Sequence, residues 1–163
     1  MQRPVWIGLA AFSLCFAQAS LAEAQIKRPG AHIDYDFEAE PHLLLGPITP
    51  IDDDDDLGIG FRGTLELVDN GFVKSINNTV GIGFGFDHND HVTRLPVVMQ
   101  WNFWLHRSFS VFGEPGVALR LRSGRRFDPF VLYAGGRWHF TDWGALTFRI
   151  GHPVASIGVS FFL

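Results

Sequence analysis

The sequence predicts an all-β protein, an eight-stranded antiparallel up-and-down barrel that follows a cleaved N-terminal signal peptide. Three observations predict it. Apolar and polar residues alternate over most of the chain, and helical spacing is absent. The chain has 18 glycines and 16 phenylalanines, which is typical of many strands separated by short turns. Its first 24 residues have the pattern of an export signal.

The signal is predicted over residues 1–24. Arg3 precedes an uncharged apolar run, and the small residues Ala22 and Ala24 predict cleavage after Ala24. The run is too short to span a bilayer. The single cysteine, Cys15, lies inside it, so the predicted mature chain has no thiol or disulfide chemistry. Residues 25–163 then form one domain, and we expect it to hold no cofactor.

Eight strands are predicted in the mature chain, each a run of alternating residues that ends at turn-forming residues. In order they are residues 32–46, 57–68, 79–87, 94–106, 109–123, 129–140, 144–151 and 155–163. The connection at residues 124–128 is predicted to be a loop between the fifth and sixth strands. No linker separates the strands, which favours a single closed sheet.

Alternation gives each strand two chemically different faces. Along residues 94–106 one face holds Leu95, Val97, Met99, Trp101, Phe103 and Leu105, and the other holds Arg94, Gln100, Asn102 and His106. Along residues 129–140 the apolar face holds Phe130, Leu132, Ala134, Trp138 and Phe140, opposite Tyr133, Arg137 and His139. Along residues 32–46 it holds Ile33, Tyr35, Phe37, Leu43 and Leu45, opposite Asp34, Asp36, Glu38, Glu40 and His42.

The apolar faces are too bulky and aromatic for the narrow interior of an eight-stranded barrel. Turned outward into lipid, they need no such room, so the fold class becomes a transmembrane β-barrel. The alternative from the residues alone is a secreted soluble, lipocalin-like ligand-binding barrel with a solvated charged face. A net charge of −4 argues against a nucleic-acid surface.

The last residues of the sequence carry a further pattern. Ser156, Gly158, Phe161 and Leu163 have the order and spacing polar, glycine, aromatic, hydrophobic. This resembles the terminal insertion signal of bacterial outer-membrane barrels, and with the export signal and the even strand number the chain is similar to the small eight-stranded outer-membrane protein A, X and W group. The resemblance implies location in the cell outer membrane after export to the periplasm. It also implies contact with outer-membrane lipid and lipopolysaccharide, insertion by the barrel-assembly machinery, and a monomer.

Charged residues on the inward faces must pair, because eight strands enclose room for side chains only. Counting from the connection at 124–128 sets Glu114 opposite Arg137, and the next hairpin sets Arg137 beside Arg149. We also expect Arg62 to reach Glu40. The predicted lumen network comprises Glu38, Glu40, Arg62, Glu114, Arg137 and Arg149, and it closes the barrel to ions.

Two other patterns suggest chemistry. The triplet His106, Arg107, Ser108 has the His-x-Ser spacing of the lipid A 3-O-deacylases, with Glu114 as an orienting acid, so a lipid A-modifying enzyme is a second alternative. A polar turn is the interpretation we favour. Asp52, Asp54 and Asp56 could bind a divalent cation weakly, although the sequence fails the EF-hand pattern. The predicted function is a structural or surface-interaction role without catalysis.

Overall fold

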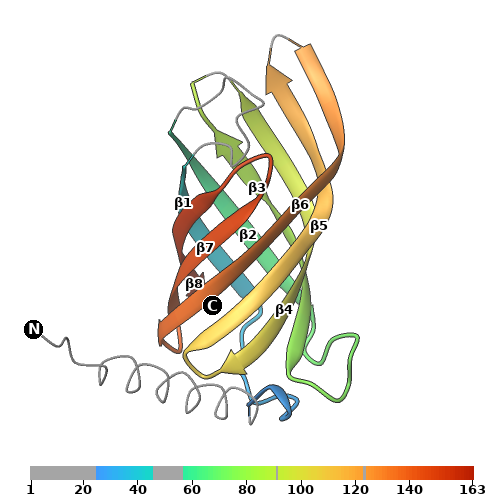
Figure 1. Cartoon of the computed structure of the whole chain (residues 1–163), viewed down its shortest axis with the longest axis vertical. Helices are drawn as coiled ribbons and strands as arrows, with labels where there is room; N and C mark the ends of the chain where they lie inside the picture. The colour runs from blue at the N-terminus through green and yellow to red at the C-terminus, as the bar shows by residue number, and fades with distance from the viewer. Residues whose placement is uncertain (1–24, 46–56, 91, 123) are drawn as a thin grey trace, which may run out of the picture.

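Strand order and closure define the architecture. The computed structural model describes residues 25–45, 57–90, 92–122 and 124–163. Its eight strands are β1 (Phe37–Leu44), β2 (Gly58–Val68), β3 (Asn78–His88), β4 (Thr93–His106), β5 (Phe109–Arg122), β6 (Gly124–Thr141), β7 (Gly144–His152) and β8 (Ser156–Phe162). Each pairs with its chain neighbour, and β8 closes on β1, all antiparallel (Figure 1). The predicted up-and-down barrel is confirmed.

The start of β1 differs from the prediction, because the strand begins at Phe37 rather than at residue 32. The carbonyl of Leu163 accepts the backbone N–H groups of Asp36 and Phe37, at 2.9 and 3.1 Å. Since β8 ends there, earlier residues have no partner on the β8 side, and on the other side the last bond to β2 is from the Glu66 N–H to the carbonyl of Asp36, at 3.0 Å. The expected outward position of Tyr35 is therefore wrong, because this side chain turns into the barrel and is buried. Asp36, expected to face inward, is exposed.

The connection between β5 and β6 also differs. The predicted loop at 124–128 is wrong, because β6 begins at Gly124 and the ladder runs almost to the turn, with Arg122 paired to Gly124 and Leu119 to Phe127. The connection between β5 and β6 is therefore much shorter than the predicted loop. This hairpin extends farthest beyond the rest of the barrel, at the end away from the C-terminus (Figure 1).

The barrel has an inverted distribution of polarity. Its buried residues include four arginines, four acids, two histidines and many amide or hydroxyl side chains. Large apolar residues are exposed on the outside of every strand, and they include Leu43, Ile59, Leu65, Ile82, Phe84, Val97, Phe109, Leu132, Trp138, Phe148, Ile150 and Phe161. The outward faces predicted for β4 and β6 agree with this. Among the residues that the structure describes, no helix is long and apolar enough to cross a membrane.

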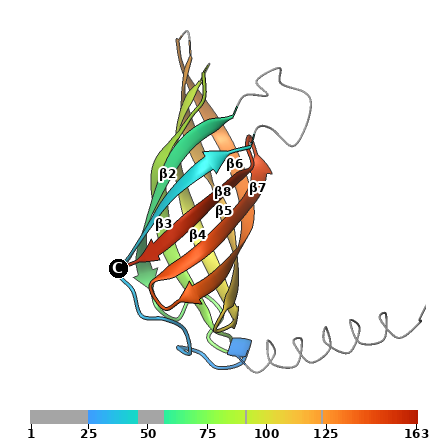
Figure 2. The same ribbon diagram turned by 90° about the vertical axis from the view of Figure 1, so that its left-hand side faces the viewer.

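One end of the barrel, here called the terminal end, holds residues 25–36 and Leu163. Residues 25–36 run across this end before entering β1 (Figure 2). Tyr35 packs edge-on against Phe162 and lies beside Trp104. The ring of His139 is tilted against the rings of both Trp104 and Phe162. Burial raises the pKa of the Tyr35 phenol above its usual range. An aromatic cluster therefore fills the lumen at the terminal end.

Candidate functional site: a charged network in the lumen

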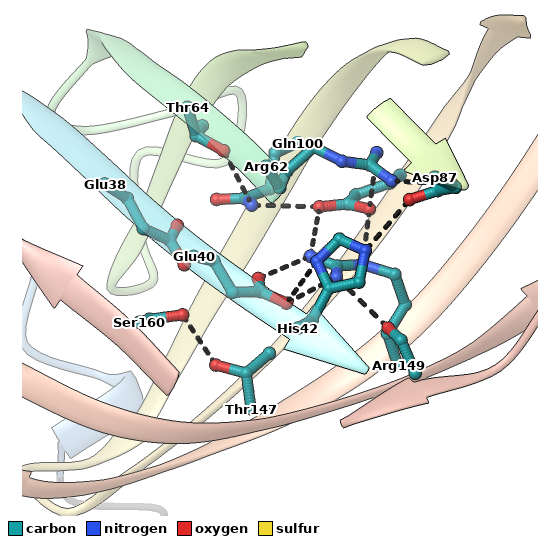
Figure 3. A network of polar contacts seen from close by, with 12 residues as sticks. Glu38, Glu40, His42, Arg62, Thr64, Asp87, Gln100, Thr147, Arg149 and Ser160 are labelled. Atoms are coloured by element: carbon teal, nitrogen blue, oxygen red, sulfur yellow. Dashed lines mark hydrogen bonds and ion pairs between the residues drawn. The ribbon is translucent and has the colours of Figure 1, made fainter. Parts of the chain in front are cut away.

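The six residues of the predicted lumen network project inward from five strands. Glu38 and Glu40 come from β1, Arg62 from β2, Glu114 from β5, Arg137 from β6 and Arg149 from β7, and all six are almost completely buried. They occupy alternate positions, as the two-residue repeat of a strand requires. The structure brings the six together with Asp87 of β3 and His42 of β1. Figure 3 labels six of these eight, namely Glu38, Glu40, His42, Arg62, Asp87 and Arg149. These eight residues are called the lumen network below.

Arg149 contacts two carboxylates at once. Its Nη1 and Nη2 donate to the two oxygens of Glu40 at 2.7 and 2.8 Å, which is a bidentate pair. Its Nε and Nη2 donate to Glu114 at 2.9 and 3.2 Å. The two acids belong to strands on different sides of β7 in the barrel, so one guanidinium links β7 to β1 and to β5 across the lumen.

Two further arginines complete the ion pairs. Arg137 Nη2 donates to Glu38 Oε2 at 2.8 Å, and Nη1 donates to the side-chain oxygen of Asn102 at 3.1 Å. Arg62 lies 3.6 Å from a carboxylate oxygen of Asp87 and 3.7 Å from one of Glu114. Glu114 also accepts a hydrogen bond from Gln100 at 3.0 Å.

The pairing within this set differs from the expectation. Glu114 lies opposite Tyr133, and Arg137 lies opposite Ser110, because β5 and β6 stay paired as far as Arg122 and Gly124. Arg137 therefore pairs with Glu38, and Glu114 pairs with Arg149 and Arg62. Arg62 is opposite Glu40 in the β1–β2 register, yet Glu40 is held by Arg149.

Aromatic rings lie close to the arginines, and the sequence analysis did not predict these contacts. The guanidinium of Arg137 lies 4.1 Å from the centre of the Phe112 ring, and that of Arg149 lies 5.2 Å from it. Arg62 lies 5.4 Å from the ring of Tyr133. The negative face of an aromatic ring attracts a cation, so Phe112 lets two like charges approach each other. Its inward position between Ser110 and Glu114 is visible in the alternation of β5.

Asp87 and His42 are the other members that the prediction did not include. His42 Nε2 lies 2.9 Å from Asp87, and His42 Nδ1 lies 3.6 Å from Glu40. Two glycines on the strands beside β1, Gly60 and Gly158, leave space for the His42 side chain. A Cβ on Gly60 would collide with the His42 ring and with the backbone oxygen of Phe86, and one on Gly158 would meet His42 and Glu40. Asp87 is the only charged residue at an inward position of β3, which is the signal that could have found it.

The network fills the middle of the barrel with charge. Removing a charged group from water costs several kcal/mol unless hydrogen bonds and opposite charge compensate it. Here carboxylates and guanidiniums alternate, and each arginine has at least one acid within 4 Å. The aromatic cluster at the terminal end is a second group of buried side chains on the inside of the barrel.

The four residues of the terminal pattern divide between the two faces of β8. Ser156 and Gly158 face inward, and Ser156 Oγ lies 3.5 Å from Arg149. Phe161 and Leu163 face outward, where Phe161 stacks on Trp143 with ring centres 6.2 Å apart. The backbone of Leu163 bonds to that of Phe37 and so joins β8 to β1.

The structure does not assemble the deacylase-like triad. The backbone N–H of Ser108 donates to His106 Nδ1 at 3.1 Å, which is a local turn contact, and Glu114 is engaged by Arg149 inside the lumen. The orienting role considered for Glu114 is therefore wrong. Asp52, Asp54 and Asp56 lie outside the described residues.

Comparison with known proteins identifies a fold and no family. No family model matches the chain, and no curated protein matches it. Among solved structures it is similar to the solution NMR structure of the de novo designed protein TMB2.3, with a TM-score of 0.53 at 12% identity. The match covers 79% of this chain and 94% of the designed one. At this identity the likeness supports the barrel fold alone.

Proposed function

We propose that the protein is an integral β-barrel of the cell outer membrane, with a structural or surface-interaction role and a plugged lumen. The observation that carries the proposal is the inverted polarity. Charged side chains such as Arg137 and Glu114 are fully buried, whereas Leu132, Ile150 and Trp138 on the same strands or their neighbours are about half exposed. Exposed apolar surface costs roughly 25 cal/mol per Å² in water, and lipid removes this cost.

The proposal includes an orientation. Barrels of this class place both ends of the chain in the periplasm and their longer loops outside. The terminal end would then face the periplasm, and the long β5–β6 hairpin would reach the cell surface near lipopolysaccharide. The signal at residues 1–24 would direct export, and Ser156, Gly158, Phe161 and Leu163 would be read by the barrel-assembly machinery. Monomers suffice, because β1 and β8 leave no open edge.

A plugged lumen follows from the contacts across it. An ion entering from either end meets the pairs of Arg149 with Glu40 and Glu114, and the terminal end is filled by Trp104, Tyr35 and Phe162. We therefore propose a protein that does not form a wide pore. We also propose that it is not an enzyme and uses no cofactor.

The soluble and enzymatic alternatives gain no specific support. A lipocalin-like barrel needs an apolar interior for its ligand, and here the middle of the interior is charged. A lipid A deacylase built on the triplet needs His106 beside the Ser108 hydroxyl, whereas its Nδ1 accepts the Ser108 backbone N–H.

Three measurements on one preparation test the proposal. The purified protein should float with lipid vesicles in a density gradient and resist extraction by alkaline carbonate. The same vesicles, fused to a planar bilayer, should show no stable conductance step. Recovery of the protein in the aqueous fraction would reject the membrane location, and a stable open channel in wild-type protein would reject the plug.

A further inference from the structure

Three potential metal ligands meet at the terminal end of the barrel, apart from the lumen network. They are His32 in the segment before β1, Glu66 near the end of β2 and Asp69 in the turn after β2. One nitrogen or oxygen from each lies within 4.8 Å of those of the other two. Residues far apart in sequence are thus gathered at one point.

The imidazole of His32 is held firmly. Its side chain is only 2% exposed, and its ring stacks on Trp104 with centres 5.4 Å apart and planes 17° apart. Nδ1 lies 2.5 Å from the side-chain oxygen of Asn77. A carbonyl oxygen can only accept, so Nδ1 carries the proton. Metal-binding histidines are commonly fixed in this way, by an N–H donated from the nitrogen that does not bind the metal.

For a neutral imidazole, this arrangement sets two hydrogen-bond acceptors against each other at the second nitrogen. In a neutral ring Nε2 presents a lone pair, and it lies 2.9 Å from Asp69 Oδ1, which also can only accept. Beside them Glu66 has an oxygen, Oε2, that is buried and makes no hydrogen bond. The carboxylates of Glu66 and Asp69 and the lone pair of His32 Nε2 therefore lie around one point, and a cation there would be stabilised by all three.

We propose that His32, Glu66 and Asp69 bind a divalent transition metal ion of the Zn²⁺ type. One imidazole nitrogen and two carboxylate oxygens form a ligand set that such ions accept, whereas Ca²⁺ and Mg²⁺ prefer oxygen alone. Bound Zn²⁺ needs ligand atoms roughly 3.3 Å apart, for bonds of about 2.0 Å. The side chain of Asp69 is 73% exposed and can rotate to reach this spacing.

The metal would fasten the segment before β1 to the barrel. His32 belongs to that segment, and its ligand partners belong to β2 and to the β2–β3 turn. The backbone N–H of Asn77 also donates to the carbonyl of Ile26, so the segment already crosses this turn. A bound ion would add a stronger link to these contacts and hold the segment across the terminal end.

Calorimetry on the full chain, folded in detergent micelles, tests the site. We expect one Zn²⁺ per chain with micromolar or tighter affinity, not displaced by excess Mg²⁺. His32→Phe keeps the stacking on Trp104 and removes both nitrogens, and Asp69→Asn changes an exposed turn residue. Each should weaken Zn²⁺ binding at least tenfold while the barrel keeps its heat-modifiable gel mobility.

Two control variants separate this site from others. His88→Asn removes an exposed histidine near the opposite end of the barrel, and a variant with Asp52, Asp54 and Asp56 all changed to Asn removes the acidic run. Both should bind Zn²⁺ as the wild type does. The proposal is overturned if wild-type protein does not bind Zn²⁺ at micromolar concentration, which would leave a second proton as the occupant, or if the His32 and Asp69 variants bind it unchanged. Because the assay uses micelles, its result does not depend on the proposed membrane location.

Discussion

The buried charge of Arg149 is compensated by two acids, Glu40 and Glu114, and the charge of each acid is compensated by arginine. Glu114 is fully buried, accepts hydrogen bonds from Arg149 and Gln100, and lies 3.7 Å from Arg62. Alternation along the strands predicted the inward position of all six charged residues in the expected network, although it placed Asp36 inward wrongly. It could not predict their partners, because long side chains reach across the barrel. Which acid an arginine pairs with depends on three-dimensional distances, and alternation gives no information on these. Phe112 was missed for a related reason, since an inward phenylalanine contradicts a simple polar-inside rule.

Glu114→Gln should destabilise the barrel strongly. The change removes a negative charge and leaves Arg149 and Arg62 partly uncompensated, which costs about 3–5 kcal/mol for a buried pair. Urea titration of the protein in lipid vesicles measures this. Asp142→Asn is the matched control, because the Asp142–Arg107 pair is largely exposed and should contribute less than about 1 kcal/mol. Equal, small effects of both changes would show that the lumen charges are solvated.

Glycines at inward and outward positions should respond differently to alanine. A Cβ on Gly60 collides with His42 and the backbone of Phe86, so Gly60→Ala should cost about 1–3 kcal/mol. A Cβ on Gly113 meets nothing within 4 Å, and Gly113→Ala should be neutral or slightly stabilising. The same titration compares them. A neutral Gly60→Ala would mean that His42 and Asp87 do not occupy the positions described.

At the scale of the element, most strand positions were predictable within a few residues, and the two larger errors share a cause. Alternation continues through residues 32–36 and breaks at 124–128, which predicted a strand in the first range and a loop in the second. Where a strand ends, however, depends on whether a neighbouring strand supplies hydrogen-bonding partners. β1 begins where Leu163 supplies a partner, and β6 extends because β5 continues beside it. The length of a neighbouring strand cannot be predicted from the sequence of one strand alone.

Val97 on β4 offers a test of the outer face. It is 46% exposed and lies near the middle of its strand. Arginine at a lipid-facing position near the bilayer midplane costs about 2–4 kcal/mol. Val97→Arg should lose this amount in vesicle titrations, whereas Val97→Leu should be nearly neutral. An arginine variant as stable as the leucine variant would place Val97 in water.

The end of β8 combines an inward and an outward phenylalanine, which separates packing from recognition. Phe162 belongs to the aromatic cluster in the lumen, and Phe161 is on the outside. Phe162→Ala should therefore lower the stability of purified protein by about 3–5 kcal/mol. Phe161→Ala should fold nearly normally in detergent but reach the outer membrane poorly in cells, as a fractionation would measure. Normal assembly of the Phe161 variant would remove this residue from the insertion signal.

For the whole molecule, the same sequence pattern explains two features: the sheet closes into a barrel, and the apolar side chains lie outside while the charged ones lie inside. A closed eight-stranded barrel has an interior too narrow for the aromatic residues, so they face outward and the charges face one another. This argument predicted the barrel from composition and alternation. It did not predict residues 25–36 across the terminal end, because that segment has no repeat and its position depends on contacts of His32 and Tyr35 with distant strands.

Spin labels on the outside of the reconstituted barrel test the central claim most directly. Cysteine can be introduced at Val97 and Leu132 on the apolar exterior and at Asp142 in an exposed turn, after replacing Cys15 with serine. Collision with oxygen, which dissolves in lipid, is then compared with collision with a water-soluble nickel chelate. The account predicts high oxygen and low nickel accessibility at Val97 and Leu132, and the reverse at Asp142. High nickel accessibility at both strand positions would contradict a lipid-facing exterior.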